Sequence, residues 1–344
     1  MTSDEKESKQ NTTKRTSHKS PKAGKGKSNL VTVLLILVFI AGICILAYPT
    51  VSDYMNSYNQ SRAIMTYMED VSNMDASEYE YWIESAREYN QRITDNGPNW
   101  IQTEADKEAY EKQMAYNPNG SMGYITIEKL GTMLSIYHGT SDEVLRTGVG
   151  HIEGSSLPIG SASWDTKEGR VTDPEEGVHI VLSGHRGLPS AKLFSDLDKL
   201  DEGDIFTINV LNETLTFQVD QIRVVEPTDL STLKVYKGED YCTLVTCTPY
   251  GINTHRLLVR GKRVANAQGD VKLVADAMQI RWIYIVPFIV VPIILILMLL
   301  ALINARLGEK QRKRIAALQK AIKDNAEAPV KAPQKNNEIK SFFS

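Results

Sequence analysis

Alternating apolar and polar residues indicate a series of short β-strands in the central part of the chain. In residues 241–247 successive side chains fall on opposite faces, and Thr, Val and Tyr, which favour strands, are frequent there. Gly, Pro, Asn and Asp separate further runs of this kind, at residues 123–127, 132–137, 178–183, 205–210, 214–219, 222–225 and 256–264. Short strands divided by such residues are typical of an all-β barrel or sandwich.

A helical period replaces this alternation in three places. Apolar residues spaced three to four apart predict a helix over residues 78–92, and residues 105–116 fit a second helix. Between the predicted strands, residues 191–200 predict one inserted helix. Residues 155–177 show neither period and contain Gly, Asp and Pro, which indicates a long exposed loop.

Two uncharged apolar stretches stand apart from these patterns, at residues 30–48 and 282–303. With 19 and 22 residues, each is long enough to cross a bilayer core as a helix. The alternative for the first stretch is a cleaved signal peptide, because a basic segment precedes it. The apolar core of a signal peptide is usually shorter, about 7–15 residues. The pattern therefore favours a retained anchor.

The formal net charge of −3 conceals an uneven distribution. Residues 1–29 carry a net charge of +5 and residues 304–344 a net charge of +6, which leaves 21 of the 39 basic and 35 of the 42 acidic residues between the two tails. Because basic flanks stay inside, we expect both termini in the cytoplasm and the acidic middle outside the cell membrane. An acidic domain also argues against a nucleic-acid partner, whereas the basic tails suit anionic lipid.

These patterns divide the chain into seven segments of distinct character. We expect a disordered basic tail (1–29), a membrane helix or signal-anchor (30–48), a helical region (49–121), a β-domain (122–268), a tether (269–281), a second membrane helix (282–303) and a basic cytoplasmic tail (304–344).

Candidate chemistry lies where one predicted strand ends at Cys247 and the next begins at Arg256. Pro249 and Gly251 signal a turn between them, so a hairpin would set the thiol beside the guanidinium at the rim of the sheet. Cys242 points to the opposite face and cannot form a disulfide with Cys247. A thiol beside a permanent cation suits nucleophilic attack on a carbonyl, since the arginine can stabilise the oxyanion.

A nucleophilic cysteine needs a proton acceptor, and His185 is the best placed of the six histidines. It follows a strand that ends at residue 183, and flanking glycines leave its ring exposed. His179 precedes an apolar run and is expected to be structural, while His255 points away from the face of Arg256. The alternative for His185 is a solvated loop residue. Metal binding finds little support, because no Cys and His cluster has ligand spacing.

The sequence around these three residues resembles the class C sortases, the pilus-building group of a family of cysteine transpeptidases. The resemblance rests on Thr-Leu-Val-Thr-Cys-Thr-Pro-Tyr-Gly-Ile-Asn-Thr-His-Arg at residues 243–256 and on Ser-Gly-His-Arg-Gly-Leu-Pro at residues 183–189. Ile-Tyr-His-Gly-Thr-Ser at residues 136–141 and Gly-Val-Gly-His-Ile-Glu-Gly-Ser-Ser-Leu-Pro at residues 148–158 extend it. It covers about residues 80–303, and the second apolar stretch also fits that class.

The resemblance implies a mainly β fold: a sortase-type closed β-barrel with N-terminal helices and one inserted helix, flanked by two transmembrane helices. It implies an enzyme that cleaves an LPxTG-like sorting signal through a thioacyl-enzyme at Cys247 and passes the acyl group to a pilin lysine. His185 would be the general acid/base, and Arg256 would stabilise the oxyanion and the substrate. The implied partners are pilin or other surface proteins with a C-terminal sorting signal, with no cofactor and no metal.

Two alternatives to this function stay open. A sortase can instead anchor single surface proteins to cell-wall peptidoglycan, using a peptidoglycan amine as the nucleophile. The chain can also be an inactive membrane-tethered binding module.

Class C sortases often carry a lid with an Asp-Pro-aromatic motif over the cleft, and this chain departs from that motif. The nearest string is Asp-Asn-Gly-Pro-Asn-Trp, in which Asp95, Pro98 and Trp100 are spaced differently. Either these residues form a lid with altered spacing, or they belong to a plain loop between two helices.

Overall fold

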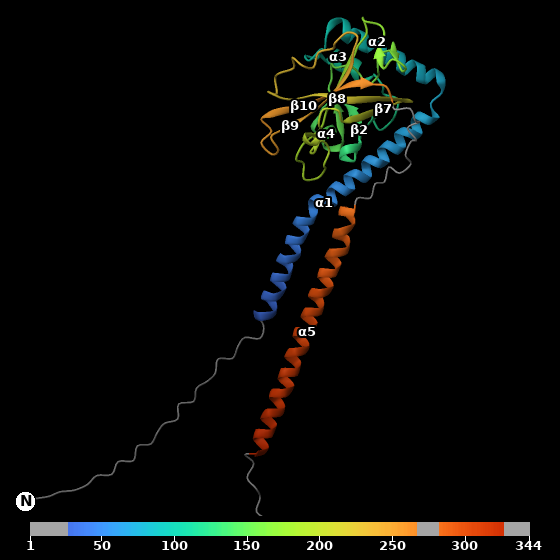
Figure 1. The fold of residues 1–344 in the computed structure, drawn as a ribbon. Coiled ribbons are helices and arrows are strands. Elements are labelled where there is room, and N and C mark those ends of the chain that lie inside the picture. The colour runs from blue at the N-terminus through green and yellow to red at the C-terminus, as the bar shows by residue number, and fades with distance from the viewer. Residues whose placement is uncertain (1–26, 267–281, 327–344) are drawn as a thin grey trace, which may run out of the picture. The chain divides into compact units, whose positions relative to one another are not determined.

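The computed structural model describes residues 27–266 and 282–326. Its strands are β1 (Ser121–Ile127), β2 (Thr132–His138), β3 (Val149–His151), β4 (Trp164–Asp165), β5 (Arg170–Val171), β6 (Val178–Ser183), β7 (Ile205–Val210), β8 (Glu213–Val225), β9 (Asp240–Thr248) and β10 (His255–Val264). Eight of them form a closed barrel in the order β1-β2-β3-β6-β9-β10-β8-β7, and β1 pairs with β7 to close it. Figure 1 labels five of these strands, β2, β7, β8, β9 and β10. The β2–β3 and β6–β9 pairs are parallel. The remaining two strands, β4 and β5, pair with each other.

The prediction of an all-β domain is confirmed, and the alternative of a sandwich is excluded. The predicted strands at residues 214–219 and 222–225 form one continuous strand, β8. The register of β8 against the neighbouring β10 shifts between Arg260 and Gly261, which leaves Asp220 of β8 as the extra residue of a bulge. A Cβ on Gly261 would lie 2.7 Å from the ring of Phe206, so only glycine fits at this bulge.

The barrel interior is filled by the inward-facing side chains of every strand. The rings of Phe206 and Phe217 stack at 5.5 Å, and Leu244 of β9 and Val259 of β10 are fully buried beside the other core residues. Burial of such a side chain contributes about 1.5–3 kcal/mol, so the alternation along β9 and β10 fixes which of their residues face inward.

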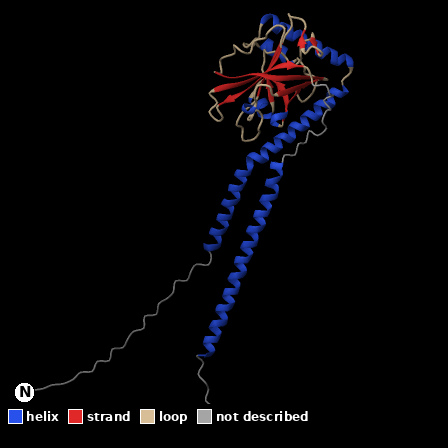
Figure 2. Ribbon diagram, in the orientation of Figure 1, coloured by secondary structure: helices blue, strands red, loops and turns tan. Residues whose placement is uncertain are grey.

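The helices are α1 (Lys27–Asn73), α2 (Ala76–Asn96), α3 (Glu104–Glu111), α4 (Asp142–Thr147) and α5 (Trp282–Ala326). Asp75 caps the start of α2, and Thr103 forms a capping box with Asp106 at the start of α3. The predicted helix at residues 78–92 is confirmed. The helix predicted at residues 105–116 ends earlier than expected, at residue 111. Figure 2 distinguishes the helices, in blue, from the strands, in red.

The inserted helix predicted for residues 191–200 is wrong. Only one 3₁₀ turn, η2 (Leu197–Lys199), forms there. Leu193 adopts a positive φ of 38°, which a right-handed helix cannot contain, and the N–H of Phe194 donates to the carbonyl of His185 at 3.1 Å. Tertiary contacts therefore override the local helical spacing in the segment that follows His185.

Helix α1 continues the first apolar stretch well beyond its predicted end. Leu34–Asn73 is the one helix in the described residues found to be long and apolar enough to cross a membrane. Contacts divide the chain into two units, Met1–Ala47 and Tyr48–Ser344. Within the second unit, Tyr67 of α1 is buried, and its hydroxyl accepts a hydrogen bond from the N–H of Leu211 at 2.6 Å. The predicted second membrane helix falls in α5 and stays a prediction.

Four predicted segments lie wholly or partly outside the described residues. These are the tether at residues 269–281, the last two residues of the β-domain, 267–268, and parts of the two basic tails, residues 1–26 and 327–344.

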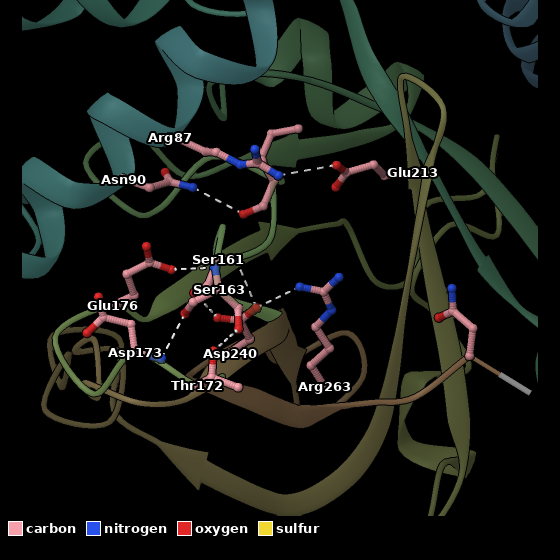
Figure 3. Close-up of polar contacts among 12 residues, drawn as sticks. Arg87, Asn90, Ser161, Ser163, Thr172, Asp173, Glu176, Glu213, Asp240 and Arg263 are labelled. Carbon is pink, nitrogen blue, oxygen red and sulfur yellow. Dashed lines mark hydrogen bonds and ion pairs between the residues drawn. The ribbon is translucent and has the colours of Figure 1, made fainter. Parts of the chain in front are cut away.

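The segment between β3 and β6 is more buried than the predicted exposed loop. Its residues 155–161 are buried, and the backbone N–H of Ser161 donates to the carboxylate of Asp240 at 3.0 Å. Asp240 is itself buried and forms an ion pair with Arg263 at 2.8 Å (Figure 3). The prediction is therefore wrong for residues 155–161, because a strand carboxylate holds their backbone against the barrel.

Candidate active site

Cys247 and Arg256 lie directly opposite each other on β9 and β10. The register of this antiparallel pair places Arg256 against Cys247 and His255 against Thr248. Directly opposed residues in a sheet have Cβ atoms about 4.5–5.5 Å apart, so their side chains share one face. The predicted hairpin is confirmed in fold and in register.

His185 reaches the same rim of the barrel from β6. Parallel pairing sets Ser183 beside Val245, and the N–H of the following Gly184 donates to the carbonyl of Val245 at 3.0 Å. The hydroxyl of Thr246 donates to the carbonyl of Gly184 at 2.7 Å. Continuing this register by two residues beyond the end of β6 would place His185 level with Cys247. The β9–β10 hairpin and the end of the distant strand β6 thus bring the predicted thiol, guanidinium and imidazole to one edge of the barrel.

The polar surroundings leave these three groups partly accessible. The side chain of His185 is 30% exposed, and its Nε2 lies 3.9 Å from Oδ1 of Asp142 on α4. The guanidinium of Arg256 donates to the carbonyls of Asn253 and His255, at 3.4 and 3.2 Å. Within the described residues Arg256 forms no ion pair with a carboxylate. Its charge is therefore available to an anion that develops beside Cys247.

Three other candidate groups, the thiol of Cys242 and the imidazoles of His151 and His179, are buried, whereas the imidazole of His255 is exposed. Burial raises the pKa of the Cys242 thiol and lowers the pKa of His151 and of His179 to about 4. Nε2 of His179 bonds the hydroxyl of Thr243 at 2.7 Å, which confirms its structural role. These groups are fixed within the core and cannot meet a peptide substrate.

An apolar patch lies on the outer face of the barrel, on the side to which Cys247 points. Val245 precedes Cys247 by two residues and so shares its face, and Leu258, which pairs with Val245, shares the face of Arg256. Despite facing outward, Val245 is only 7% and Leu258 only 5% exposed. We call this cluster the outer patch, and it consists of buried Val181, Leu233, Val245 and Leu258 with half-buried Trp100, Ile152 and Val225 packed against them.

Trp100 reaches the outer patch from the loop between α2 and α3. The N–H of Asn99 donates to the carbonyl of Gly154 at 3.1 Å, and the side chain of Gln102 donates to the carbonyl of Asn99 at 2.6 Å. Ile101, next to Trp100, is 88% exposed. The loop thus turns one aromatic side chain inward onto the patch and leaves its neighbour in solvent.

The other two residues of the candidate lid are placed differently. Asp95 lies in the last turn of α2, and its carboxylate accepts a hydrogen bond from Gln91 of the same helix at 3.0 Å. Pro98 is half-buried in the loop. Of the three, only Trp100 packs on the outer patch. The sequence signal for this contact was a lone tryptophan in a turn-rich segment, and spacing alone could not show where it packs.

No group of three or more His, Cys, Asp and Glu side chains suited to a metal ion is present among the described residues.

Comparison with known proteins agrees with this geometry. A sequence model of the sortase domain matches residues 125–264. The crystal structure of sortase C1 from Streptococcus agalactiae is 53% identical, with 60% of this chain and 100% of that chain covered and a TM-score of 0.54. A structure of sortase C1 of GBS Pilus Island 1 is 39% identical, with coverage of 61% and 94% and a TM-score of 0.51.

A curated relative is more distant. Sortase D of Bacillus subtilis is 28% identical over 145 residues, which make up 41% of this chain and 63% of that protein. The chain thus matches somewhat less than two thirds of the length of this relative.

Proposed function

The chain belongs to the sortase family, and on that premise we propose that it is a membrane-anchored cysteine transpeptidase that joins pilin subunits. The observation that supports the proposal is the register that sets Arg256 opposite Cys247, together with His185, which follows the end of the neighbouring strand β6 by two residues. Similarity to a sortase C1 whose name refers to a pilus island supports pilin as the substrate.

The first half-reaction forms a thioacyl-enzyme. The sulfur of Cys247 attacks the carbonyl carbon of the Thr in an LPxTG-like sorting signal, and Arg256 stabilises the oxyanion. The amide C–N bond then breaks, and His185 gives a proton to the leaving Gly amine. The half-buried position of the thiol limits the access of water to the thioester.

The second half-reaction transfers the acyl group to an amine. A pilin lysine attacks the thioester carbon, His185 accepts the proton of that amine, and the C–S bond breaks to restore the thiolate of Cys247. An isopeptide bond then links the two subunits. The partners are pilin or other surface proteins with a C-terminal sorting signal.

We further propose that Trp100 acts as a lid. The outer patch begins two residues from Cys247, which is where apolar side chains of a sorting signal would pack. Trp100 covers this patch, and its loop carries Pro98, with Asp95 at the preceding helix end. Displacing Trp100 would expose Val245 and Leu258 to the substrate. The altered spacing of the Asp-Pro-aromatic motif is compatible with a lid in which the tryptophan alone makes the contact.

The proposed membrane arrangement follows from charge and hydropathy. The apolar part of α1 anchors the chain, and residues 282–303 form a second span within α5. The basic tails at residues 1–29 and 304–344 keep both termini in the cytoplasm, and the acidic catalytic domain is extracellular. The active site would thereby meet secreted proteins that carry sorting signals.

A competition between two amines tests the proposed function. Purified full-length chain is incubated with an LPxTG donor peptide, a lysine-bearing pilin fragment and a peptidoglycan stem peptide, and the products are separated by mass. We expect the isopeptide with the pilin lysine to dominate and to disappear in Cys247→Ala. Preferential transfer to the stem peptide would identify a wall-anchoring sortase instead. No product in the native enzyme would indicate an inactive binding module.

A further inference from the structure

Arg186, the residue after His185, has an unusual environment for an arginine in a loop. Its side chain is only 8% exposed. Its Nη2 forms an ion pair with Asp198 at 2.5 Å, and its Nη1 donates to the hydroxyl of Thr248 at 3.2 Å. The guanidinium carbon also lies 5.8 Å from the ring centroid of Tyr250. One side chain thus connects the loop after β6 with the turn between β9 and β10.

These contacts fall on either side of the reacting groups. Before His185, Gly184 bonds β9 at Val245 and Thr246. After His185, Arg186 bonds Thr248, which directly follows Cys247. The histidine is therefore tied to the cysteine strand at the residues before and after the cysteine. Withdrawal of the His185 backbone from β9 would require one of these ties to break.

A guanidinium suits this task because its donors lie in one rigid plane. It can hold a carboxylate and a hydroxyl at the same time while stacking on an aromatic ring, whereas an ammonium offers a point charge on a flexible stem. Within the described residues, Nε of Arg186 is buried and has no acceptor. A buried N–H without a partner is unfavourable. The burial of Arg186 therefore differs from that of an ordinary surface arginine, whose guanidinium is hydrated.

We propose that Arg186 is a positioning residue that holds His185 in line with Cys247, with Asp198 and Thr248 as its two anchors. The inference rests on the proposed function, because it assigns Arg186 a role through the acid/base histidine. Arg186 itself does not touch the substrate. Its contribution is to keep the imidazole within proton-transfer distance of the thiol and of the amine that leaves or enters.

The test measures kcat and KM of the full-length chain in detergent with a fluorogenic LPxTG peptide. Rates are divided by the concentration of enzyme with a reactive Cys247, which is determined by thiol titration. Arg186→Ala should lower kcat by about 10- to 100-fold, because misplacement of a catalytic group by about 1 Å can cost that much. KM should stay within about twofold, since no substrate contact is removed. Arg186→Lys should restore thermal stability but not kcat.

A matched control comes from Arg260 on β10. Its side chain is 16% exposed, pairs with Asp220 at 2.7 Å and lies 4.3 Å from the ring of Tyr241. Arg260→Ala therefore removes a similar ion pair and a similar aromatic contact elsewhere on the barrel. It should lower the melting temperature like Arg186→Ala and leave kcat within about twofold of the native value.

Two outcomes separate this inference from the proposed function. If Cys247→Ala retains activity, the proposed function fails. If Cys247→Ala is inactive and Arg186→Ala keeps native kcat, only the positioning role is overturned. Should Arg186→Ala fail to fold, Thr248→Val removes one anchor alone and should lower kcat several-fold at unchanged KM. A native kcat for Thr248→Val would then overturn the proposal.

Discussion

Replacing Trp100 by alanine should open the outer patch and speed up cleavage of a peptide substrate. A fully buried tryptophan hides up to about 200 Å². Since Trp100 is half-buried, we take about 100 Å² as its contact with the patch, which is worth about 2.5 kcal/mol at 25 cal/mol per Å². If this energy holds the lid closed, only a small fraction of the molecules is open. The apparent Kd for substrate is then the intrinsic Kd divided by that open fraction, so the apparent affinity is low.

The energy sets the size of the expected gain. About 2.5 kcal/mol corresponds to a factor of about 60 in an equilibrium constant. This factor is an upper limit, because an opened loop gains conformational entropy, which already favours opening. We therefore expect kcat/KM for a fluorogenic sorting-signal peptide to rise between about 5- and 60-fold in Trp100→Ala, mainly through KM.

Ile101→Ala is the matched control, because Ile101 belongs to the same loop but is 88% exposed. It should leave kcat/KM unchanged. If Trp100→Ala lowers the melting temperature without raising kcat/KM, Trp100 is a packing residue and the lid interpretation fails.

Three further predictions follow from packing and protonation. Arg263→Ala should lower the free energy of unfolding by about 3–5 kcal/mol, because it leaves a buried carboxylate unpaired; a loss below about 1 kcal/mol in urea denaturation would contradict this. Lowering the pH from 7 to 5 should reduce the free energy of unfolding by about 2 kcal/mol for each of His151 and His179. The reason is that burial lowers their pKa to about 4 in the folded protein, whereas in the unfolded chain the same side chains bind protons below about pH 6.5. Equal urea midpoints at both pH values would refute this prediction. Gly184→Ala would place a Cβ 2.6 Å from the ring of Phe194, so it should shift the histidine that follows and lower kcat about tenfold, which peptide cleavage by the purified variant would measure.

The parts of the site that depend on strand alternation could be predicted from the sequence. The pairing of Cys247 with Arg256 follows from two alternating runs and one turn signal at Pro249 and Gly251, because a short turn limits the registers available to a hairpin. The position of His185 follows from the end of β6 and the glycine before it. The pairing of β6 with β9, which brings His185 toward Cys247, joins distant segments and does not follow from local chemistry.

The parts that depend on contacts between distant segments could not be predicted. The expected helix at residues 191–200 gives way to buried Leu193 and Phe194, which pack on the barrel instead of forming helical hydrogen bonds. Likewise, Trp100 packs on the outer patch, whose buried residues lie about 80–160 positions further along the chain, and no local pattern indicates that contact. The extension of α1 to Asn73 was also missed, because polar residues interrupt its apolar period after the first stretch.

The proposed covalent step at Cys247 is tested most directly by the intact mass of the protein during the reaction. The full-length chain is mixed with an LPxTG peptide in the absence of any amine acceptor, quenched in acid and measured by mass spectrometry. The account predicts an adduct equal to the acyl part of the peptide, located on Cys247 by digestion and absent in Cys247→Ala. Cleavage of the peptide with no adduct on Cys247, or an adduct that persists in Cys247→Ala, would contradict it.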